Sequence, residues 1–494
     1  MISWLSRQPL ALFLSLQALV TCWNLGMLSP WGDEAGTLLM VRGPLGTLVR
    51  WAAEDVHPPL YYSLLYCWQR LPLGLDWAIQ ARLLSVVFAL LATIALDRLW
   101  ARHIGERARW VLLALWTLSP CLLLYARMCR SYTLQALCAI VAVAFLVRVV
   151  GKFSARDAAF LTLAVLAALY THYVAGIALV ATANLVLLRR RSWRTALGID
   201  LLLAVGYSPW LPTLLASLAA WGRNGRNYNL TGSRFAEVPV KFAYWAMSFT
   251  MGEAVPDAVL VLGVLMLPLI AWAVWKGARG TSSVAWAAGT LAAIGFFGVA
   301  RWVSYPFVPA RMLFVLPFFL LLVARAVEVS PRWGRLAAAA MLLLSISGVI
   351  SYFGKAGFRN KEYPIPIREI AERILRESNA DDSVVLVDST NSDPIAMLYA
   401  LHPRRAVLQT AALEASGEME RILYKPEIHT VWFLRNTHDV SADRWNDRLR
   451  ARLRTQMKES VQAFEPYTPL ERWLMQRLGG GSRDYFQELL EYQR

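Results

Sequence analysis

Two adjacent carboxylic acids, Asp33 and Glu34, are the residues of this chain best placed for chemistry. They closely follow the apolar run Pro9 to Leu28, which is long enough to cross a bilayer. A carboxylate beside hydrocarbon is costly and usually persists there for ion, proton or substrate chemistry. At such a border its pKa can rise, and it can act as a general base on a hydroxyl group. The simpler alternative is an N-cap acid for a helix that begins near Ala35.

A second polar group stands at Glu54, Asp55 and His57, directly before a Pro-Pro pair. Its oxygen and imidazole groups could hydrogen-bond a sugar or hold a divalent metal such as Mg²⁺ or Mn²⁺. In the metal interpretation, the candidate ligands are Glu34, Asp55 and His57. The alternative is helix capping, with the prolines starting the next helix. We predict ligand binding here, while a metal requirement stays open.

Further polar groups fall at turns between apolar runs. Arg127, Arg130 and Tyr132 share one such turn, where guanidinium groups can hold a phosphate in bidentate fashion. Snorkelling of the arginines to the membrane surface is the alternative. His172-Tyr173 and Arg311 occupy two other turns, where ionisable groups beside hydrocarbon are expensive unless they face a cavity. We predict that all of these residues bind substrate, with helix-to-helix hydrogen bonds as the competing interpretation.

The elements that must position these residues are membrane helices. The chain has 494 residues, of which 57% are hydrophobic and 17% charged, a balance typical of a multi-span membrane protein. Its formal charge of +16 is unaccompanied by any nucleic-acid motif. We therefore predict membrane lipids as partners and no nucleic acid. The five cysteines lack metal-site spacing and are interpreted as packing residues.

The apolar runs predict about eleven membrane helices. Basic clusters mark the cytoplasmic turns, so the N-terminus is cytoplasmic and every motif above falls on the opposite, outer face. For this count to hold, Leu60 to Trp68 and Val238 to Met251 must be interfacial helices. The predicted spans are 8–28, 82–100, 110–125, 132–150, 157–171, 174–190, 195–217, 256–275, 283–303, 306–327 and 334–353.

Two domains are expected, a membrane domain over 1–353, with a first outer loop at 29–81, and a soluble domain over 354–494. After Phe353 no run is long enough to span a membrane, and alternating helix and strand patterns predict a small α/β domain on the outer face. The predicted helices are 365–375, 394–401, 413–424 and 442–457, and the predicted strands are 383–388, 405–409 and 428–434.

The motifs together resemble a known family. Asp33-Glu34, then Asp55-Val56-His57-Pro58-Pro59-Leu60, then the Arg-x-x-Arg-x-Tyr turn after Ser119-Pro120 resemble the protein O-mannosyltransferase and aminoarabinose-transferase group of GT-C fold glycosyltransferases. The resemblance covers roughly the first 330 residues. Two departures exclude transfer of either specific activity. The chain lacks a large lumenal insertion, and it has His57 where aminoarabinose transferases have a lysine.

The resemblance implies a polyprenyl-phosphate sugar donor, attack at C1 with inversion, and Asp33 as the base. It also implies that Asp55 and His57 line the site and that Arg127, Arg130 and Arg311 lie near the lipid phosphate. The expected protein is a glycosyltransferase of the bacterial inner membrane that modifies a surface glycan, glycolipid or protein. Two alternatives stay open: a flippase or transporter of lipid-linked sugars, and a surface-polysaccharide polymerase or ligase with a diphosphate donor.

Overall fold

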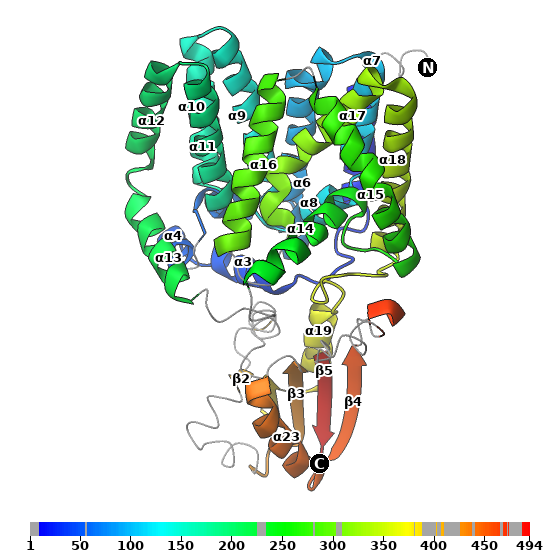
Figure 1. Cartoon of the computed structure of the whole chain (residues 1–494). Helices are drawn as coiled ribbons and strands as arrows, with labels where there is room; N and C mark the ends of the chain where they lie inside the picture. Colours follow the sequence, from blue (N-terminus) through cyan, green and yellow to red (C-terminus); the bar gives the residue numbers. More distant parts are fainter. Residues whose placement is uncertain are drawn as a thin grey trace. The chain divides into compact units, whose positions relative to one another are not determined.

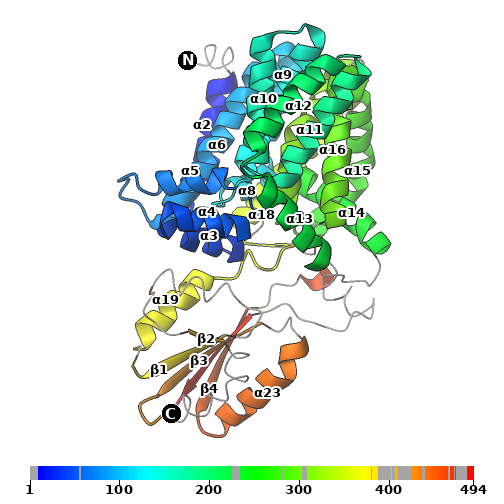
Figure 2. The ribbon, with the colours of Figure 1, turned by 90° about the vertical axis from the view of Figure 1, so that its left-hand side faces the viewer.

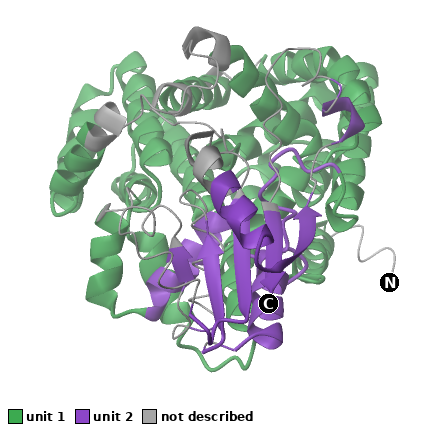
Figure 3. Ribbon diagram, turned by 90° about the horizontal axis from the view of Figure 1, so that it is seen from below, with its two compact units in different colours: residues 1–25, 43–356 green, residues 26–42, 357–494 purple. Residues whose placement is uncertain are grey.

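The structure is a computed structural model of the chain. It describes residues 9–54, 57–224, 234–279, 282–302, 309–379, 381–387, 402, 407–409, 425–436, 440–464, 468–471, 473 and 487–494. Two compact units make up the chain (Figure 3). The first comprises Met1–Leu25 and Gly43–Ala356, and the second comprises Gly26–Arg42 and Gly357–Arg494. The predicted first loop at 29–81 is thus divided, because its opening residues group with the C-terminal part of the chain.

The first unit is helical (Figure 1). Its elements are α2 (Pro9–Cys22), α4 (Leu45–Glu54), α5 (Leu60–Trp68), α6 (Trp77–Leu99), η1 (Ala101–His103), α7 (Glu106–Thr117), α8 (Pro120–Ala126), α9 (Tyr132–Gly151), α10 (Ala155–Leu169), α11 (Tyr173–Arg189), α12 (Trp193–Tyr207), α13 (Leu211–Asn224), α14 (Arg234–Met251), α15 (Asp257–Ala278), α16 (Ser282–Trp302), η2 (Pro309–Val315), α17 (Leu316–Val329) and α18 (Pro331–Phe353).

Helix-capping residues set several of these boundaries. Asp76 accepts hydrogen bonds from the backbone N–H groups of Ala78 and Ile79 and so begins α6. Ser119 accepts one from Leu122 and is followed by a proline at the first position of α8. His172 caps α11 in the same way, through the N–H of Ala175. Local sequence therefore fixes where the helices around the predicted turns begin.

Eleven membrane spans are not confirmed. Within the described residues, five helices are long and apolar enough to cross a membrane, or up to seven if two bent pairs each form one span. The described part of each predicted span falls largely on helix, but α7 and α8 meet at 48° and α12 and the start of α13 at 85°. Prolines at 120, 209 and 212 stand at these breaks and cannot continue a helix. The predicted interfacial segment 60–68 is α5, which at 9 residues is too short to span.

Turns rich in basic residues gather at one end of the helical unit. The connections from α9 to α10, from α11 to α12 and from α17 to α18 lie at the end where α2 begins (Figures 1 and 2). These connections and the adjoining helix ends carry, among others, Arg148, Arg190 and Arg332. The segments α4 and α5 lie toward the other end of this unit. The unit therefore has one end rich in basic residues and another end that carries α4 and α5.

The second unit is built on a five-stranded mixed sheet in the order β2-β1-β3-β5-β4. Strand β1 pairs in parallel with β2 and β3, whereas β5 pairs antiparallel with both β3 and β4. The elements of this unit are α3 (Gly32–Arg42), α19 (Ile367–Glu377), β1 (Ser383–Val387), β2 (Val407–Gln409), β3 (Thr430–Asn436), α23 (Val440–Arg454), β4 (Lys458–Phe464) and β5 (Gln487–Gln493).

Helices cover both faces of this sheet (Figure 2). On one face, α19 packs Ile370 and Ile374 against Trp432 of β3, and on the other, α23 packs Leu449 and Leu453 against the strands. The predicted α/β character is thus confirmed for the described residues. The predicted helices at 394–401 and 413–424 lie outside them. Strands β4 and β5 were not predicted, because KESVQAF and QELLEYQ are too polar to be recognised as strands.

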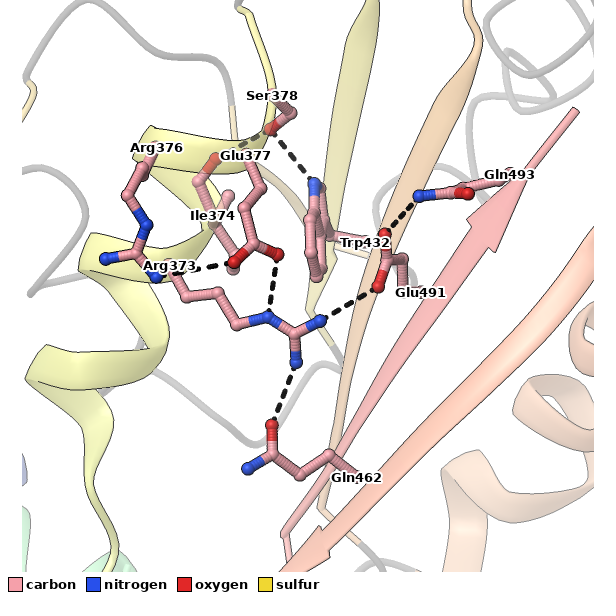
Figure 4. Close-up of polar contacts among 9 residues, drawn as sticks. All are labelled: Arg373, Ile374, Arg376, Glu377, Ser378, Trp432, Gln462, Glu491 and Gln493. Carbon is pink, nitrogen blue, oxygen red and sulfur yellow. Dashed lines mark hydrogen bonds and ion pairs between the residues drawn. The ribbon is translucent and has the colours of Figure 1, made fainter.

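One arginine ties α19 to the sheet (Figure 4). Arg373 donates through Nε to Glu377 at 2.8 Å, through Nη1 to Gln462 at 3.0 Å and through Nη2 to Glu491 at 3.0 Å. Its guanidinium also lies 5.4 Å from the ring centre of Trp432. Because the planar fork reaches β4 and β5 at once, it fixes the helix over the antiparallel half of the sheet.

Candidate functional site

In the helical unit, the structure brings His57 and Arg130 into direct contact. Nη2 of Arg130 donates to Nε2 of His57 over 3.0 Å, so the imidazole accepts at this nitrogen. The two residues come from segments 73 positions apart, the turn before α5 and the turn between α8 and α9. The start of α5 is itself held by a 2.9 Å hydrogen bond from the N–H of Leu60 to the carbonyl of Tyr170. That bond also brings His57 toward the turn that carries His172.

Arg130 is held from several sides. Its backbone carbonyl accepts a 3.1 Å hydrogen bond from Ser85 of α6, and the Ser85 hydroxyl lies 2.8 Å from that of Tyr61. Its guanidinium lies about the same distance from two aromatic rings, 5.9 Å from Tyr62 and 6.0 Å from Tyr132. With 4% of its surface exposed, the side chain is fixed before any ligand binds.

His172 and Arg311 complete a group that we call the basic cluster: His57, Arg130, His172 and Arg311. The pKa of His172, which lies outside the helices, is lowered to about 3, first by burial and then by His57, Arg311 and Arg130. His172 is therefore neutral near pH 7, and the charge of the cluster comes mainly from its two arginines. Among the described residues, the groups that act on His172 in this way are all basic side chains.

Arg311 lies on η2, which packs against α9 and α11. Gln135 of α9 positions this turn through a 2.6 Å hydrogen bond to the carbonyl of Ala310. Nη1 of Arg311 is buried and makes no hydrogen bond within the described part of the chain. A buried guanidinium nitrogen without an acceptor is costly. The basic cluster is therefore suited to an anion that supplies the acceptor oxygens.

Arg127 has other partners than the predicted phosphate. Its Nη1 donates to the carbonyls of Val20, Thr21 and Trp23, and its Nη2 to that of Asn24 at 2.5 Å. Its Nε donates to the hydroxyl of Tyr352 at 2.9 Å. These carbonyls belong to the last turn of α2 and the residues after it, so Arg127 closes that helix end.

The remaining predicted site residues are distributed as follows. Asp33 and Glu34 lie in the first turn of α3, in the second unit. Glu54 ends α4, whereas its side chain and all of Asp55 lie outside the described residues. Tyr132 begins α9 and packs edge-on against Tyr125 at 5.3 Å. The hydroxyl of Tyr173 accepts a 2.9 Å hydrogen bond from Trp210.

The described residues do not fit a metal site. Across the described part of the chain, no three His, Cys, Asp or Glu side chains gather in a way that could hold a metal ion. His57, one of the candidate ligands, accepts from the cationic Arg130, a poor neighbour for a divalent cation. We therefore derive no step through a metal.

Sequence reasoning did not identify Glu253, which lies between α14 and α15 and is 1% exposed. Its carboxyl group accepts hydrogen bonds from the hydroxyls of Tyr125, Tyr244 and Ser248. Burial raises the pKa of Glu253 to about 7, although the three hydroxyl groups oppose this rise. Because Tyr125 ends α8 and packs on Tyr132, Glu253 supports the segment that carries Arg130. A single acid between two apolar runs was the sequence signal that could have found it.

The apolar helices of the first unit and the mixed sheet of the second define a multi-pass membrane protein with a C-terminal α/β domain. The fold is that of the GT-C glycosyltransferases, as the motifs predict. The crystal structure of ArnT from Cupriavidus metallidurans bound to undecaprenyl phosphate matches 97% of both chains, with a TM-score of 0.57 and 14% identity. Its apo state matches with a TM-score of 0.56.

A second match comes from an archaeon. The oligosaccharyltransferase AglB from Archaeoglobus fulgidus, in complex with an inhibitory peptide and a dolichol-phosphate, has a TM-score of 0.51 and 12% identity. The match covers 88% of this chain and 70% of AglB. No protein-family model and no curated protein sequence matches the chain. At these identities the likeness establishes the fold.

Proposed function

We propose that this protein is an integral membrane glycosyltransferase that moves a sugar from a polyprenyl-phosphate donor to an acceptor hydroxyl. The fold supports this proposal, and so do the lipid phosphates named with its structural neighbours, undecaprenyl phosphate for ArnT and dolichol-phosphate for AglB. We place the reaction on the extracytoplasmic face of a bacterial inner membrane. The acceptor is a surface glycan such as lipopolysaccharide, a glycolipid or a protein.

The observation that carries the proposal is the buried Nη1 of Arg311, which has no acceptor within the described residues. Arg130 and Arg311 both lower the pKa of His172, so the two guanidinium groups lie within electrostatic range of one imidazole. A phosphate monoester or diester offers the oxygens that such a pair of guanidinium groups needs. In this proposal the basic cluster binds the phosphate of the donor.

In the reaction, Asp33 accepts the proton of the acceptor hydroxyl, as the family resemblance implies. The hydroxyl oxygen forms a new bond to C1 of the sugar, and the bond from C1 to the phosphate oxygen breaks. The phosphate leaves with that electron pair as polyprenyl phosphate, and the configuration at C1 inverts. Arg130 and Arg311 stabilise the negative charge that develops on the leaving group.

Arginine substitution tests the phosphate site. Arg311→Gln should weaken binding of undecaprenyl phosphate to the purified protein by about tenfold to hundredfold, because a charge-assisted hydrogen bond contributes roughly 1.5 to 3 kcal/mol. The same variant should raise the donor KM in transfer assays with undecaprenyl-phosphate sugars. Arg335→Gln, which removes an exposed arginine bonded to the carbonyl of Pro331, is the control. Equal lipid affinity in both variants would remove Arg311 from the site.

A second substitution tests the base. Asp33→Asn should remove nearly all transfer, leaving a small residual rate, and should leave undecaprenyl phosphate binding intact, because the amide cannot accept the acceptor's proton. Full transfer activity in this variant would exclude Asp33 as the base.

A further inference from the structure

The helix with the proposed base is part of the C-terminal domain's own core. Helix α3 belongs to the same compact unit as residues 357–494, although more than 300 positions separate them in sequence. Ala35 is fully buried in the core that contains Ile365, Ile367 and Ile370. The ring of Trp31 packs edge-on against Tyr363, with centroids 5.2 Å apart. The acid pair is thus bracketed by two residues that pack on the C-terminal domain.

Ser29 adds a polar contact at the start of α19. Its hydroxyl accepts from the backbone N–H of Arg368 at 3.2 Å and donates to the carboxylate of Glu369 at 2.5 Å. The residue before this helix, Pro366, supplies no side-chain cap. Ser29 therefore acts as the N-terminal cap of α19 from a distant part of the sequence, and its hydroxyl is held in place by Glu369, which accepts its proton in a hydrogen bond.

This attachment also orients the acid pair. Asp33 and Ala35 are two positions apart on α3, so their side chains point about 200° apart around the helix axis. Since Ala35 faces the core of the second unit, Asp33 projects from the opposite side of α3. The C-terminal domain thus packs against one face of this helix, and Asp33 lies on the other face.

We propose that the C-terminal domain positions the catalytic base, and that Ser29 and Glu369 are the positioning residues that attach the Asp33 helix to α19. The proposal rests on the proposed function, in which Asp33 is the base. Arg373 anchors α19 to β4 and β5 (Figure 4), so the helix that contacts α3 is itself fixed to the sheet. By positioning Asp33, the C-terminal domain would take a direct part in sugar transfer.

The test compares two substitutions on one helix. Glu369→Gln weakens the bond to Ser29, whereas Glu372→Gln removes only a pair with Arg368 within α19. Ser29→Ala removes the cap itself. With undecaprenyl-phosphate sugars, we expect Ser29→Ala to lower kcat about fivefold and Glu369→Gln to lower it less, both with an unchanged donor KM. Glu372→Gln should behave as the wild type.

Two further measurements separate positioning from a loss of folding. In an Asp33→Asn background, Ser29→Ala should cause no additional loss of the residual activity, because there is no base left to position. Hydrogen exchange at the amide of Arg368 should accelerate in Ser29→Ala whatever the activity. A wild-type kcat in Ser29→Ala would overturn the positioning role, whatever the exchange at Arg368. An active Asp33→Asn variant would instead overturn the base assignment, and the exchange result would still decide whether Ser29 caps α19.

Discussion

Glu253 shows how a single buried group can influence a site without belonging to it. It is excluded from solvent and holds the hydroxyl groups of Tyr125 and Tyr244. Tyr125 in turn packs on Tyr132, whose ring lies 6.0 Å from the guanidinium of Arg130. A carboxyl group in this position orders the end of α8 whether or not it is charged, because it can accept hydrogen bonds in both states.

Its pKa gives a prediction for stability. The unfolded chain releases this proton near pH 4.5, whereas the folded chain keeps it up to about pH 7. The free energy of unfolding should therefore fall as the pH rises between these values, by up to about 3 kcal/mol. Glu253→Gln should remove this part of the fall in the free energy of unfolding. Unfolding measurements in detergent from about pH 5 to pH 8 check this. Exposed Glu372→Gln is the control, and an unchanged pH dependence in Glu253→Gln would contradict the raised pKa.

At the scale of elements, two arginines of one turn have separate tasks. Arg127 closes the end of α2 with four backbone carbonyls as acceptors, whereas Arg130 contacts His57 and belongs to the basic cluster. Sequence alone treated the two as equivalent, because both follow α8 and have the spacing of a phosphate clamp. The structure distinguishes them by their partners, since Arg127 binds carbonyls at the end of α2 and Arg130 contacts His57 before α5.

Substitution should separate these tasks. Arg127→Leu should lower the free energy of unfolding by about 3 kcal/mol or more, because it leaves several buried carbonyls without donors. In the fraction that folds, the donor KM should stay near the wild-type value. Arg130→Gln should raise the donor KM with a smaller loss of stability. Thermal unfolding and steady-state kinetics on both variants check this, and a raised donor KM in folded Arg127→Leu would restore Arg127 as a phosphate ligand.

At the scale of the whole molecule, the chain is divided by packing and not by sequence order. The first 25 residues group with the helical unit, the next 17, Gly26–Arg42, with the α/β unit, and the chain then returns to the helical unit at Gly43. The acid pair and the basic cluster thus belong to different units. Each unit has its own core, so each should respond by itself to a local change.

Hydrogen exchange can test this division. Arg373→Leu breaks the fork that ties α19 to the sheet, and it should raise exchange roughly tenfold both in α19 and in α3. Exchange in α9 should not change, because that helix belongs to the helical unit. Arg335→Gln, within the helical unit, should leave α3 unaffected. If α3 kept its protection in Arg373→Leu, it would not be part of the C-terminal unit.

Much of the architecture could be predicted because it depends on local physics. Runs of apolar residues marked the helices of the first unit, and alternating helix and strand patterns after Phe353 predicted α19, β1 and β3. The motifs 33–34, 55–60 and 127–132 predicted the GT-C fold that the structural matches confirm. The number of spans could not be predicted, because a run of apolar residues does not show the bends at α8 and α13.

The sequence by itself determined the residue types that can do chemistry, their order, and the apolar segments that hold them. Only the tertiary structure decided which of them meet: His57 with Arg130, Arg127 with the end of α2, and Ser29 with α19. Spacing along a chain describes neighbours within a few turns, whereas these contacts join segments 73 to 340 residues apart. Such contacts are set by the side-chain packing of whole units, which no local pattern encodes.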